Sequence, residues 1–403
     1  MEQIDRYFEG IAWKYLSAVD AEPTRSNQHE LGGLVQAGFA RFLGEPGTET
    51  IQFPAQYILL MEAQDECTAV AGRASWYDSR RHKAGRGPEL RLYYDSNPVT
   101  EQLIAGMFLL VAKQRNGELL LIFAQRESSA EKQLRWLFGI EDSADRFAGR
   151  SVERGDEKLS WAAAWVLEQI GIEVEVRDEE HWLERIIARF GESFPTTRKF
   201  SAFARHSVED MDVLGRPDDS LMALTETEER LFRILERHIV QKRLDQGFEG
   251  VDEFISYSLS VHNTRKSRAG HSFENHLEFL FNEHEIRFVR GAYTEERSKP
   301  DFLFPGASEY HDATYATNLL SMLGVKTTCK DRWRQVLREA RRIPAKHLAT
   351  LEPGISSHQT AEMQNSGLQL VVPRPLHETF SEQQRGWLWS IEDFLDYRKR
   401  CQS

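Results

Sequence analysis

The sequence predicts two domains: a β-rich N-terminal domain of the α+β class and a C-terminal α/β domain with a mixed sheet. The chain has 403 residues, 40% hydrophobic and 11% aromatic, which is enough for more than one core. Its first third is rich in the apolar runs and alternations typical of strands. From residue 225 onward, helical and strand-like segments alternate along the chain.

The composition excludes several classes of protein. The 51 Lys+Arg and 63 Asp+Glu give a net charge of −12, which excludes a histone-like or polybasic-tail protein, so that any nucleic acid must be held by local basic patches. The three scattered cysteines suit a reducing compartment. The longest apolar run, 103–112, is too short for a membrane span, and no signal-peptide pattern is present, so we expect a cytoplasmic protein.

Residues 1–190 are expected to form a β-barrel or pseudobarrel with added helices. The segment 89–93 alternates polar and apolar residues, and two apolar runs, 103–113 and 118–124, are joined through Asn116-Gly117, a dipeptide typical of tight hairpins. Capping-box spacing at Ser128–Glu131 predicts a helix, and a second predicted helix, 161–170, ends at Gly171.

A linker is predicted over residues 191–224, where periodicity weakens and Pro, Thr, Ser, Arg and Asp accumulate. The second domain then spans 225–403. Its predicted helices are 225–244, 251–261, 271–283, 331–342, 356–366 and one that opens at Ser381. Its predicted strands are 286–290, 301–304, 323–328, 347–351 and 368–372.

A carboxylate at the start of one strand and a lysine at the end of the next form the main chemical signal. Asp301 precedes the apolar segment 302–304, and Lys326 closes the following strand. Side by side at a sheet edge, they would supply carboxylate oxygens for Mg²⁺ and an ammonium group that stabilises the phosphate and orients or deprotonates the attacking water, as phosphodiester hydrolysis requires. Taken alone, the pattern also fits a turn residue and a solvated lysine.

The commonest version of this nuclease arrangement has a second acidic residue two positions before the lysine, but that position is Gly324. The missing carboxylate must then come from elsewhere. Glu339, on the predicted helix 331–342, and Glu274, beside the apolar face of helix 271–283, are the candidates. Either glutamate taken alone also fits an ordinary surface position.

Basic residues gather close to these candidates. From Lys326 to Lys346 there are eight Lys+Arg and two acidic residues, and a second group lies just ahead of Glu274. Such patches suit contacts to DNA phosphates, and residues at a helix start can reach base edges. The candidate phosphate contacts are Arg265, Lys266 and Arg268, and the candidate base contacts are Lys330, Asp331 and Arg332. A solvated helix face is the alternative, but it fits poorly with so few acidic partners.

Four strings in residues 225–373 resemble the catalytic domain of the EcoRII-type restriction endonucleases, which are type II and type IIE-like. They are Lys266-Ser267-Arg268-Ala269-Gly270, Lys299-Pro300-Asp301-Phe302-Leu303-Phe304-Pro305, Tyr310-His311-Asp312, and the run from Val325 to Gln335. The resemblance implies a PD-(D/E)xK nuclease fold with a displaced glutamate. It implies that Glu274, Asp301, Lys326 and Glu339 are catalytic, that the three carboxylates bind Mg²⁺, and that Lys330, Asp331 and Arg332 read the C:G pairs of a CC-W-GG-like site, W being A or T.

The N-terminal third resembles the effector domain of the same family more weakly, through Gln28-His29-Glu30-Leu31-Gly32, Trp76-Tyr77-Asp78-Ser79-Arg80 and Arg86-Gly87-Pro88-Glu89-Leu90-Arg91. This resemblance implies a B3-like pseudobarrel that binds DNA and controls cleavage. The candidate DNA contacts are His29, Arg80, Arg81, Lys83, Arg86, Glu89 and Arg91. The alternative for this basic loop is a solvated hairpin tip.

Two departures from the family pattern are present. His271 stands where a lysine is expected, and the arginine-rich run ahead of the first catalytic-domain helix is replaced by 225–229, Thr-Glu-Thr-Glu-Glu, which puts a pocket for a flipped central base in doubt. The expected partners are double-stranded DNA, a second copy of the chain through the catalytic domain, and a cognate DNA methyltransferase. A methylcytosine-dependent endonuclease of the same fold and a DNA-binding regulator with an inactive nuclease domain remain the alternatives.

Overall fold

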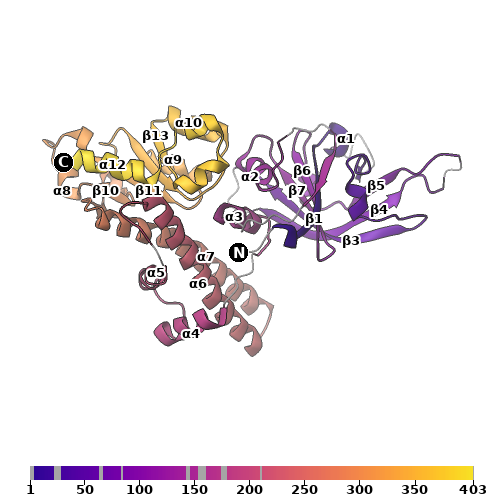
Figure 1. Cartoon of the computed structure of the whole chain (residues 1–403), viewed down its shortest axis with the longest axis horizontal. Coiled ribbons are helices and arrows are strands. Elements are labelled where there is room, and N and C mark those ends of the chain that lie inside the picture. The colour runs from indigo at the N-terminus through magenta and orange to yellow at the C-terminus, as the bar shows by residue number, and fades with distance from the viewer. Residues whose placement is uncertain are drawn as a thin grey trace. The chain divides into compact units, whose positions relative to one another are not determined.

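The computed structural model describes residues 4–21, 29–62, 67–82, 85–141, 146–152, 160–173, 179–208 and 211–402. The chain divides into two compact units (Figure 1). The first comprises Met1–Glu175 with Gly354–Ser356, and the second comprises Val176–Pro353 with Ser357–Ser403. Within the described ranges, no helix combines the length and apolar character that crossing a membrane requires.

The first unit is built on an eight-stranded sheet in the order β2-β5-β4-β3-β7-β6-β1-β8. Its strands are β1 (Phe8–Tyr15), β2 (Glu30–Leu31), β3 (Thr50–Leu60), β4 (Thr68–Asp78), β5 (Leu90–Tyr94), β6 (Phe108–Gln114), β7 (Leu119–Ala124) and β8 (Ala148–Ser151). Only β3 and β7 pair in parallel; the other neighbours are antiparallel. The predicted hairpin is confirmed as β6–β7, with Gly117 at φ +98°, a conformation that glycine adopts without strain.

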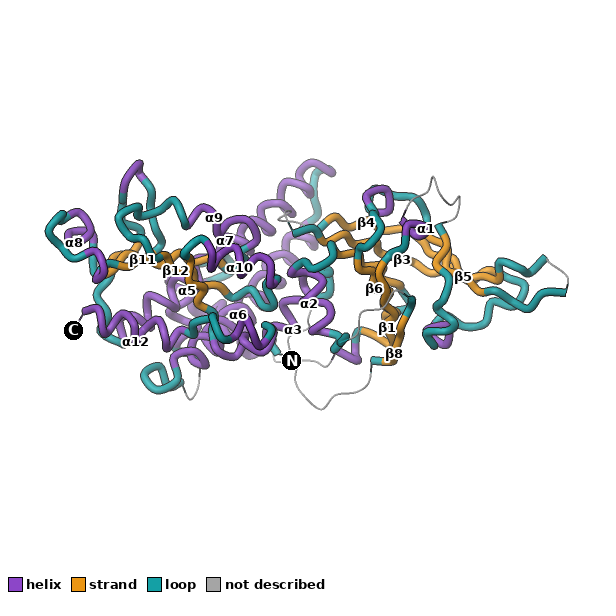
Figure 2. The backbone as a smooth tube through the Cα atoms, turned by 90° about the horizontal axis from the view of Figure 1, so that it is seen from above, coloured by secondary structure: helices purple, strands orange, loops and turns teal. Residues whose placement is uncertain are grey.

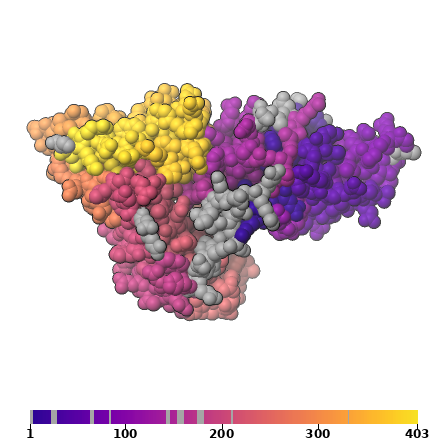
Figure 3. Space-filling view, in the orientation of Figure 1, coloured from indigo at the N-terminus to yellow at the C-terminus, as the bar shows by residue number. Residues whose placement is uncertain are grey.

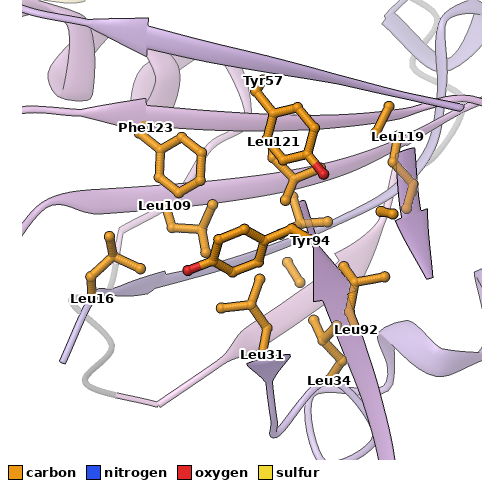
Figure 4. Close-up of a cluster of buried hydrophobic side chains, with 14 of the residues drawn as sticks. Leu16, Leu31, Leu34, Tyr57, Leu92, Tyr94, Leu109, Leu119, Leu121 and Phe123 are labelled. Atoms are coloured by element: carbon orange, nitrogen blue, oxygen red, sulfur yellow. The ribbon is translucent and has the colours of Figure 1, made fainter. Parts of the chain in front are cut away.

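Both faces of this sheet are covered. On one face, side chains from seven strands form a single apolar interior that includes Leu31, Tyr57, Tyr94, Leu109 and Phe123 (Figure 4). The opposite face packs against two helices, α2 (Ser129–Leu137) and α3 (Trp161–Gln169). The predicted cap of α2 is present, because the Ser128 hydroxyl accepts a hydrogen bond from the Glu131 N–H at 3.2 Å.

The two edges of the sheet border the same interior. An ideal Cβ at Gly149 of β8 would lie 2.8 Å from the carbonyl oxygen of Ala37, which follows β2 in the chain. Phe147, just ahead of β8, belongs to the same apolar cluster as Leu31 of β2. The sheet is therefore curled around its core. The short elements of this unit are η1 (Ile4–Arg6), α1 (Ala18–Ala21), η2 (Phe39–Phe42) and η3 (Thr100–Gln102).

The second unit begins with helices where a linker was predicted. It contains α4 (Glu179–Phe190), α5 (Thr197–Arg205), α6 (Pro217–Gln246) and α7 (Val251–Glu283). The prediction of a linker over 191–224 is wrong, because α5 and the start of α6 lie there and Phe200 and Ala204 are buried against α6. The division between the units falls at 175/176. The two helices predicted over 251–261 and 271–283 are one continuous helix, α7.

The sheet of the second unit is mixed, as predicted, in the order β13-β12-β11-β10-β9. Its strands are β9 (Val289–Arg290), β10 (Phe302–Phe304), β11 (Ser321–Lys326), β12 (Lys346–Thr350) and β13 (Leu368–Val371). The last three are parallel, and β9, β10 and β11 pair antiparallel. Around them lie η4 (Glu295–Arg297), α8 (Ala307–His311), η5 (Thr317–Leu319), η6 (Lys330–Arg332), α9 (Trp333–Val336), α10 (Ser357–Asn365), η7 (Arg374–Thr379), α11 (Glu382–Arg385) and α12 (Ile391–Gln402), with helices on both sides of the strands (Figure 2).

Each face of this sheet has its own cover. On one face, Phe281 of α7 and Phe394 of α12 contact Phe304 of β10, and Phe394 also contacts His347 of β12. Figure 3 shows the outer surface of the C-terminal helices in yellow. On the other face, Val336 of α9 lies directly over β11.

The helix predicted over 331–342 is wrong in length. Its regular part is only Trp333–Val336, and turns follow it to Arg342. Ala340 has φ +45°, which an α-helix does not accommodate. The buried Lys346 ammonium donates to the carbonyl oxygens of Glu339 and Ala340, the latter at 2.7 Å. Tertiary hydrogen bonds to these carbonyls therefore replace the helical ones that the local pattern predicts.

Candidate active site

Asp301 and Lys326 meet at one edge of the second sheet. In β10–β11 pairing, Leu303 lies opposite Met322, and alternation along the strands places Asp301, Gly324 and Lys326 on that same face. The Asp301 Oδ2 atom accepts hydrogen bonds from the Val325 N–H at 2.6 Å and from the Lys326 ammonium at 3.0 Å. The expected juxtaposition of this carboxylate and this lysine is therefore present in the structure.

Glu339 belongs to the same group of charges. Burial, together with the nearby Asp301 carboxylate, raises the pKa of Glu339 to about 7, although Lys326 and Lys346 act in the opposite direction. Its Oε2 atom is buried and has no hydrogen-bond partner among the described residues. A buried carboxylate oxygen without a donor is costly, so the site has an unfilled need for positive charge at this point.

The structure explains why no acidic residue stands at Gly324. An ideal Cβ at this position would lie 2.8 Å from Val336 Cγ2 and 3.1 Å from its Cγ1. Only glycine allows α9 to approach β11 so closely. The same close approach brings the segment after α9, with Glu339, beside Asp301. The carboxylate is displaced because α9 takes the space where it would otherwise stand.

Glu274 makes a different set of contacts. Its Oε2 atom accepts from the Arg290 guanidinium at 2.5 and 3.1 Å, and its Oε1 atom lies 3.8 Å from His271 Nδ1. Arg290 also binds Glu278 and Asn275, each at 2.7 Å. Sequence reasoning missed Arg290, whose only signal was a charged residue at the end of the predicted strand 286–290. Glu274 as a catalytic residue remains a prediction.

The residues at the edge fit a divalent cation in part. Within the described ranges, no group of three or more His, Cys, Asp or Glu side chains is assembled to hold a metal ion. Two carboxylates are nevertheless coupled there: Asp301 raises the pKa of Glu339, and Glu339 has a buried oxygen to which no described residue donates. Hard oxygen ligands of this kind suit Mg²⁺. A cation between them would relieve both the repulsion and the missing hydrogen bond.

The three basic residues on α7 are in different environments. Lys266 is exposed, whereas Arg265 is bonded to the buried Glu236 carboxylate at 3.1 and 3.2 Å. Arg268 is only 7% exposed; its Nη1 donates to the Pro195 carbonyl at 2.9 Å, and its guanidinium lies over two phenylalanine rings. The expectation that Arg268 belongs to an exposed basic patch is therefore corrected: it packs between helices.

The basic run from 326 to 346 is also largely paired inside the unit. The Arg334 guanidinium binds Glu362 at 2.9 Å, and the Arg341 guanidinium binds Glu296 at 2.8 Å. Arg342 donates to the Tyr315 carbonyl at 2.5 Å. Because these arginines bind groups of their own unit, fewer than eight basic residues of this run are available for the positive face that the composition predicts.

The predicted base-reading residues Lys330, Asp331 and Arg332 form η6, immediately after the loop that leaves β11. The Arg332 guanidinium donates to the Thr328 hydroxyl, and Lys330 has φ +34°. The side chain of Asp331 lies outside the described structure. Lys330 and Arg332 are half-buried and follow Lys326 by only a few residues in the chain.

In the first unit, three of the seven predicted DNA contacts form one charge network: Arg80 follows β4, Glu89 precedes β5 and Arg91 lies in β5. Glu89 accepts from Arg80 at 2.7 Å and from Arg91 at 2.8 Å, and Arg91 also binds Glu30 at 3.0 Å. Arg81 donates to the Thr50 hydroxyl at 2.7 Å. The other predicted contacts are His29, whose ring contacts Tyr93 and Tyr94; Arg86, which is exposed; and Lys83, which lies outside the described residues.

Comparisons with known proteins match the part of the chain that contains the candidate site. The family model described as EcoRII C terminal matches residues 232–395. The type II restriction enzyme EcoRII of Escherichia coli is 48% identical over 180 residues, which are 44% of this chain and 45% of that enzyme. The type II restriction enzyme SsoII of Shigella sonnei is 30% identical over 151 residues, 34% of this chain and 48% of that enzyme. The matches thus span about half the length of each relative.

Two solved structures are also similar. Metal-depleted Ecl18kI in complex with uncleaved, modified DNA aligns with a TM-score of 0.44 and 18% identity, covering 56% of this chain and 84% of that one. The complex of restriction endonuclease PspGI with substrate DNA aligns with a TM-score of 0.43 and 17% identity, covering 52% of this chain and 93% of that one. Residues 232–395 of this chain, which include Asp301, Lys326 and Glu339, are thus similar to the EcoRII C-terminal domain family.

Proposed function

We propose that this protein is a type II restriction endonuclease that makes Mg²⁺-dependent double-strand cuts at a short CC-W-GG-like site. The observation that carries the proposal is the meeting of Asp301, Lys326 and Glu339 at one sheet edge, inside the family match. The EcoRII and SsoII enzymes that the chain matches are type II restriction enzymes.

Each residue of the edge has a role in hydrolysis of the phosphodiester. Asp301 and Glu339, with Glu274 as the third predicted ligand, would hold Mg²⁺, which when bound polarises the phosphate and lowers the pKa of a water ligand. The Lys326 ammonium, fixed at 3.0 Å from Asp301, orients the attacking water and offsets the charge that grows on the phosphate oxygens. Lys330, Asp331 and Arg332 would contact base edges, and Lys266 and Arg265 the DNA backbone.

The first unit is proposed to be a B3-like domain that binds a second, effector copy of the site. Support comes from the curled eight-stranded sheet and from the charge network of Arg80, Glu89 and Arg91 at its surface. Ion pairs of this kind can exchange a carboxylate for a phosphate when DNA arrives. An effector role predicts faster cleavage of a two-site plasmid than of a one-site plasmid, and stimulation of the latter by an added site-bearing duplex.

The test of the proposed activity is incubation of plasmid DNA with the purified chain in Mg²⁺ and in EDTA, followed by sequencing of the product ends. Cuts at one short sequence that require Mg²⁺ are expected. Absence of any cleavage in Mg²⁺ would favour the alternative of a DNA-binding regulator with an inactive nuclease domain. Parallel digestion of methylated and unmethylated plasmid separates a conventional enzyme from a methylcytosine-dependent one. Discrimination against the methylated site would also indicate a cognate methyltransferase as partner.

A further inference from the structure

The loop between β11 and α9 holds a strained residue at the centre of the predicted base-reading segment. Lys330 has φ +34°, a region that side chains other than glycine seldom adopt. Such a conformation persists only where the surroundings hold it in place. The loop is short, because Lys326 ends β11 and Trp333 begins α9.

The first contact that holds this loop comes from Glu352, which follows β12. Glu352 is only 2% exposed, and its Oε2 atom accepts a hydrogen bond from the Cys329 N–H at 2.5 Å. The Glu352 N–H in turn donates to the Thr350 hydroxyl at 3.1 Å. Because Thr350 lies opposite Lys326 in the parallel β11–β12 pair, Glu352 ties the loop to the strand end that carries the catalytic lysine.

The second contact comes from Gln359 on α10. This residue is 6% exposed, and its Nε2 atom donates to the carbonyl oxygen of Lys330 at 2.6 Å. Glu352 and Gln359 thus hold the backbone at the strained residue from two directions. Glu352 binds the Cys329 N–H, and Gln359 binds the Lys330 carbonyl. Buried side-chain bonds to main-chain groups are costly to break, since each leaves an unsatisfied group in the interior.

We propose that Glu352 and Gln359 are positioning residues that hold Lys330 and Arg332 in register with Lys326, and so set how strictly the enzyme selects its site. This inference rests on the proposed function. The proposed function assigns neither residue to the phosphate or to the attacking water. Their loss therefore relaxes base recognition and weakens DNA binding, while the chemical step at Asp301, Lys326 and Glu339 proceeds.

The variants are Gln359→Met, which removes the donor at nearly constant length, Glu352→Leu, which removes the acceptor, and Glu352→Gln, whose side-chain carbonyl can still accept the Cys329 N–H. The matched control is Gln369→Met. Gln369 of β13 also donates through Nε2 to a backbone carbonyl, that of Trp387, at 2.8 Å, but it holds a different loop. The full chain is used with Mg²⁺ and duplex oligonucleotides that contain the site found from wild-type product ends.

The measurements are kcat, KM and the ratio of kcat/KM between the cognate duplex and duplexes with one C:G pair replaced. Gln359→Met and Glu352→Leu are expected to raise KM and to lower this ratio by about tenfold, with kcat on the cognate duplex changed less than about threefold, because one misplaced base contact is worth roughly a factor of ten or more. Glu352→Gln and Gln369→Met are expected to keep the wild-type ratio.

A purely structural role for Gln359 predicts equal effects of Gln359→Met and Gln369→Met, since both lose the same kind of bond. Wild-type KM and wild-type discrimination in Gln359→Met would overturn the inference, as would a loss of kcat without a loss of discrimination. Should Glu352→Leu fail to fold, Gln359→Met and Glu352→Gln still decide it. Failure of the wild-type chain to cut any DNA would instead overturn the proposed function, so the two failures are distinguishable.

Discussion

The charged side chains of the two candidate DNA-contacting regions differ in whether they are paired within the protein. In the first unit, Glu30 of β2, Arg91 of β5, and Arg80 and Glu89 of the β4–β5 connection neutralise one another in partly exposed ion pairs. At the sheet edge of the second unit, Glu339 repels Asp301 and has a buried oxygen that accepts no hydrogen bond from the described part of the chain. Saturated surface pairs suit exchange with a phosphate, whereas an unsatisfied buried carboxylate suits a cation and chemistry.

The largest effect expected from this contrast is on cleavage by Lys326→Ala. Removing one preorganised charge from a phosphoryl transition state costs several kcal/mol, so the cleavage rate should fall by roughly 10³-fold, while affinity for the duplex changes little. Single-turnover cleavage and a binding assay on the same duplex measure both. The matched control is Lys242→Ala, an exposed lysine paired with Glu192, which should cut at the wild-type rate. Cleavage by Lys326→Ala at the wild-type rate would show that Lys326 is not catalytic.

A second expectation concerns the close approach of α9. Gly324→Ala forces a methyl group against Val336 and should lower the free energy of unfolding by about 1–3 kcal/mol. Gly270→Ala on α7 is the control, because no atom of the described residues lies within 4 Å of its ideal Cβ, and it should stabilise by about 0.5–1 kcal/mol. Urea denaturation of both variants measures the difference. Equal stability of the two variants would contradict the packing reason for the displaced glutamate.

Glu339 should make the stability of the metal-free protein depend on pH. Because folding raises the pKa of this carboxyl from 4.5 to about 7, its contribution is fully present below pH 4.5 and is lost as pH rises through 7. Glu339→Gln should therefore be more stable than wild type at pH 8, by about 1–2 kcal/mol after allowance for partial solvent screening, and equal to it near pH 4.5. Denaturation in EDTA at both pH values measures this. A difference that does not change with pH would contradict the assignment.

The smallest effects are expected in the first unit. Both partners of the Arg80–Glu89 pair are about one-third exposed, so Arg80→Ala should change the free energy of unfolding by less than about 0.5 kcal/mol. If Arg80 takes a phosphate when DNA binds, the same variant should reduce the slope of log affinity against log salt by about 1. An unchanged salt slope would indicate that the pair is only a surface contact.

Local signals in the sequence predicted much of the fold. The β6–β7 hairpin, the cap of α2 and all five strands of the second sheet follow from turn dipeptides, caps and short apolar runs. The linker over 191–224 was wrong, because Pro and Ser around α5 masked the apolar positions Phe200 and Ala204. The helix over 331–342 was wrong, because the buried Lys346 at the start of β12 donates to the carbonyls of Glu339 and Ala340, which a helical periodicity does not reveal.

In the candidate site, too, local sequence signals predicted some residues, whereas others depend on three-dimensional contacts. The pairing of Asp301 with Lys326 was predictable, because the start of one strand and the end of the next strand along the chain meet at the same edge of an antiparallel pair. The burial of Arg268 and the bond from Arg290 to Glu274 were not, since a run of charges in a sequence does not distinguish solvent from a helix interface. Glu352 and Gln359 carry no motif, and only the three-dimensional contacts with the loop at Lys330 identify them.

The most direct test of a centre built on Asp301 and Glu339 is calorimetric titration of Mg²⁺ into the full chain bound to its DNA duplex in a cleavage-deficient Lys326→Ala background. Adding Glu339→Gln should weaken Mg²⁺ binding by roughly tenfold or more, since it removes one anionic oxygen ligand. Adding Glu278→Gln, a carboxylate held by Arg198 and Arg290 outside the edge, should leave the affinity unchanged. Equal Mg²⁺ affinity with and without the Glu339 carboxylate would contradict the account.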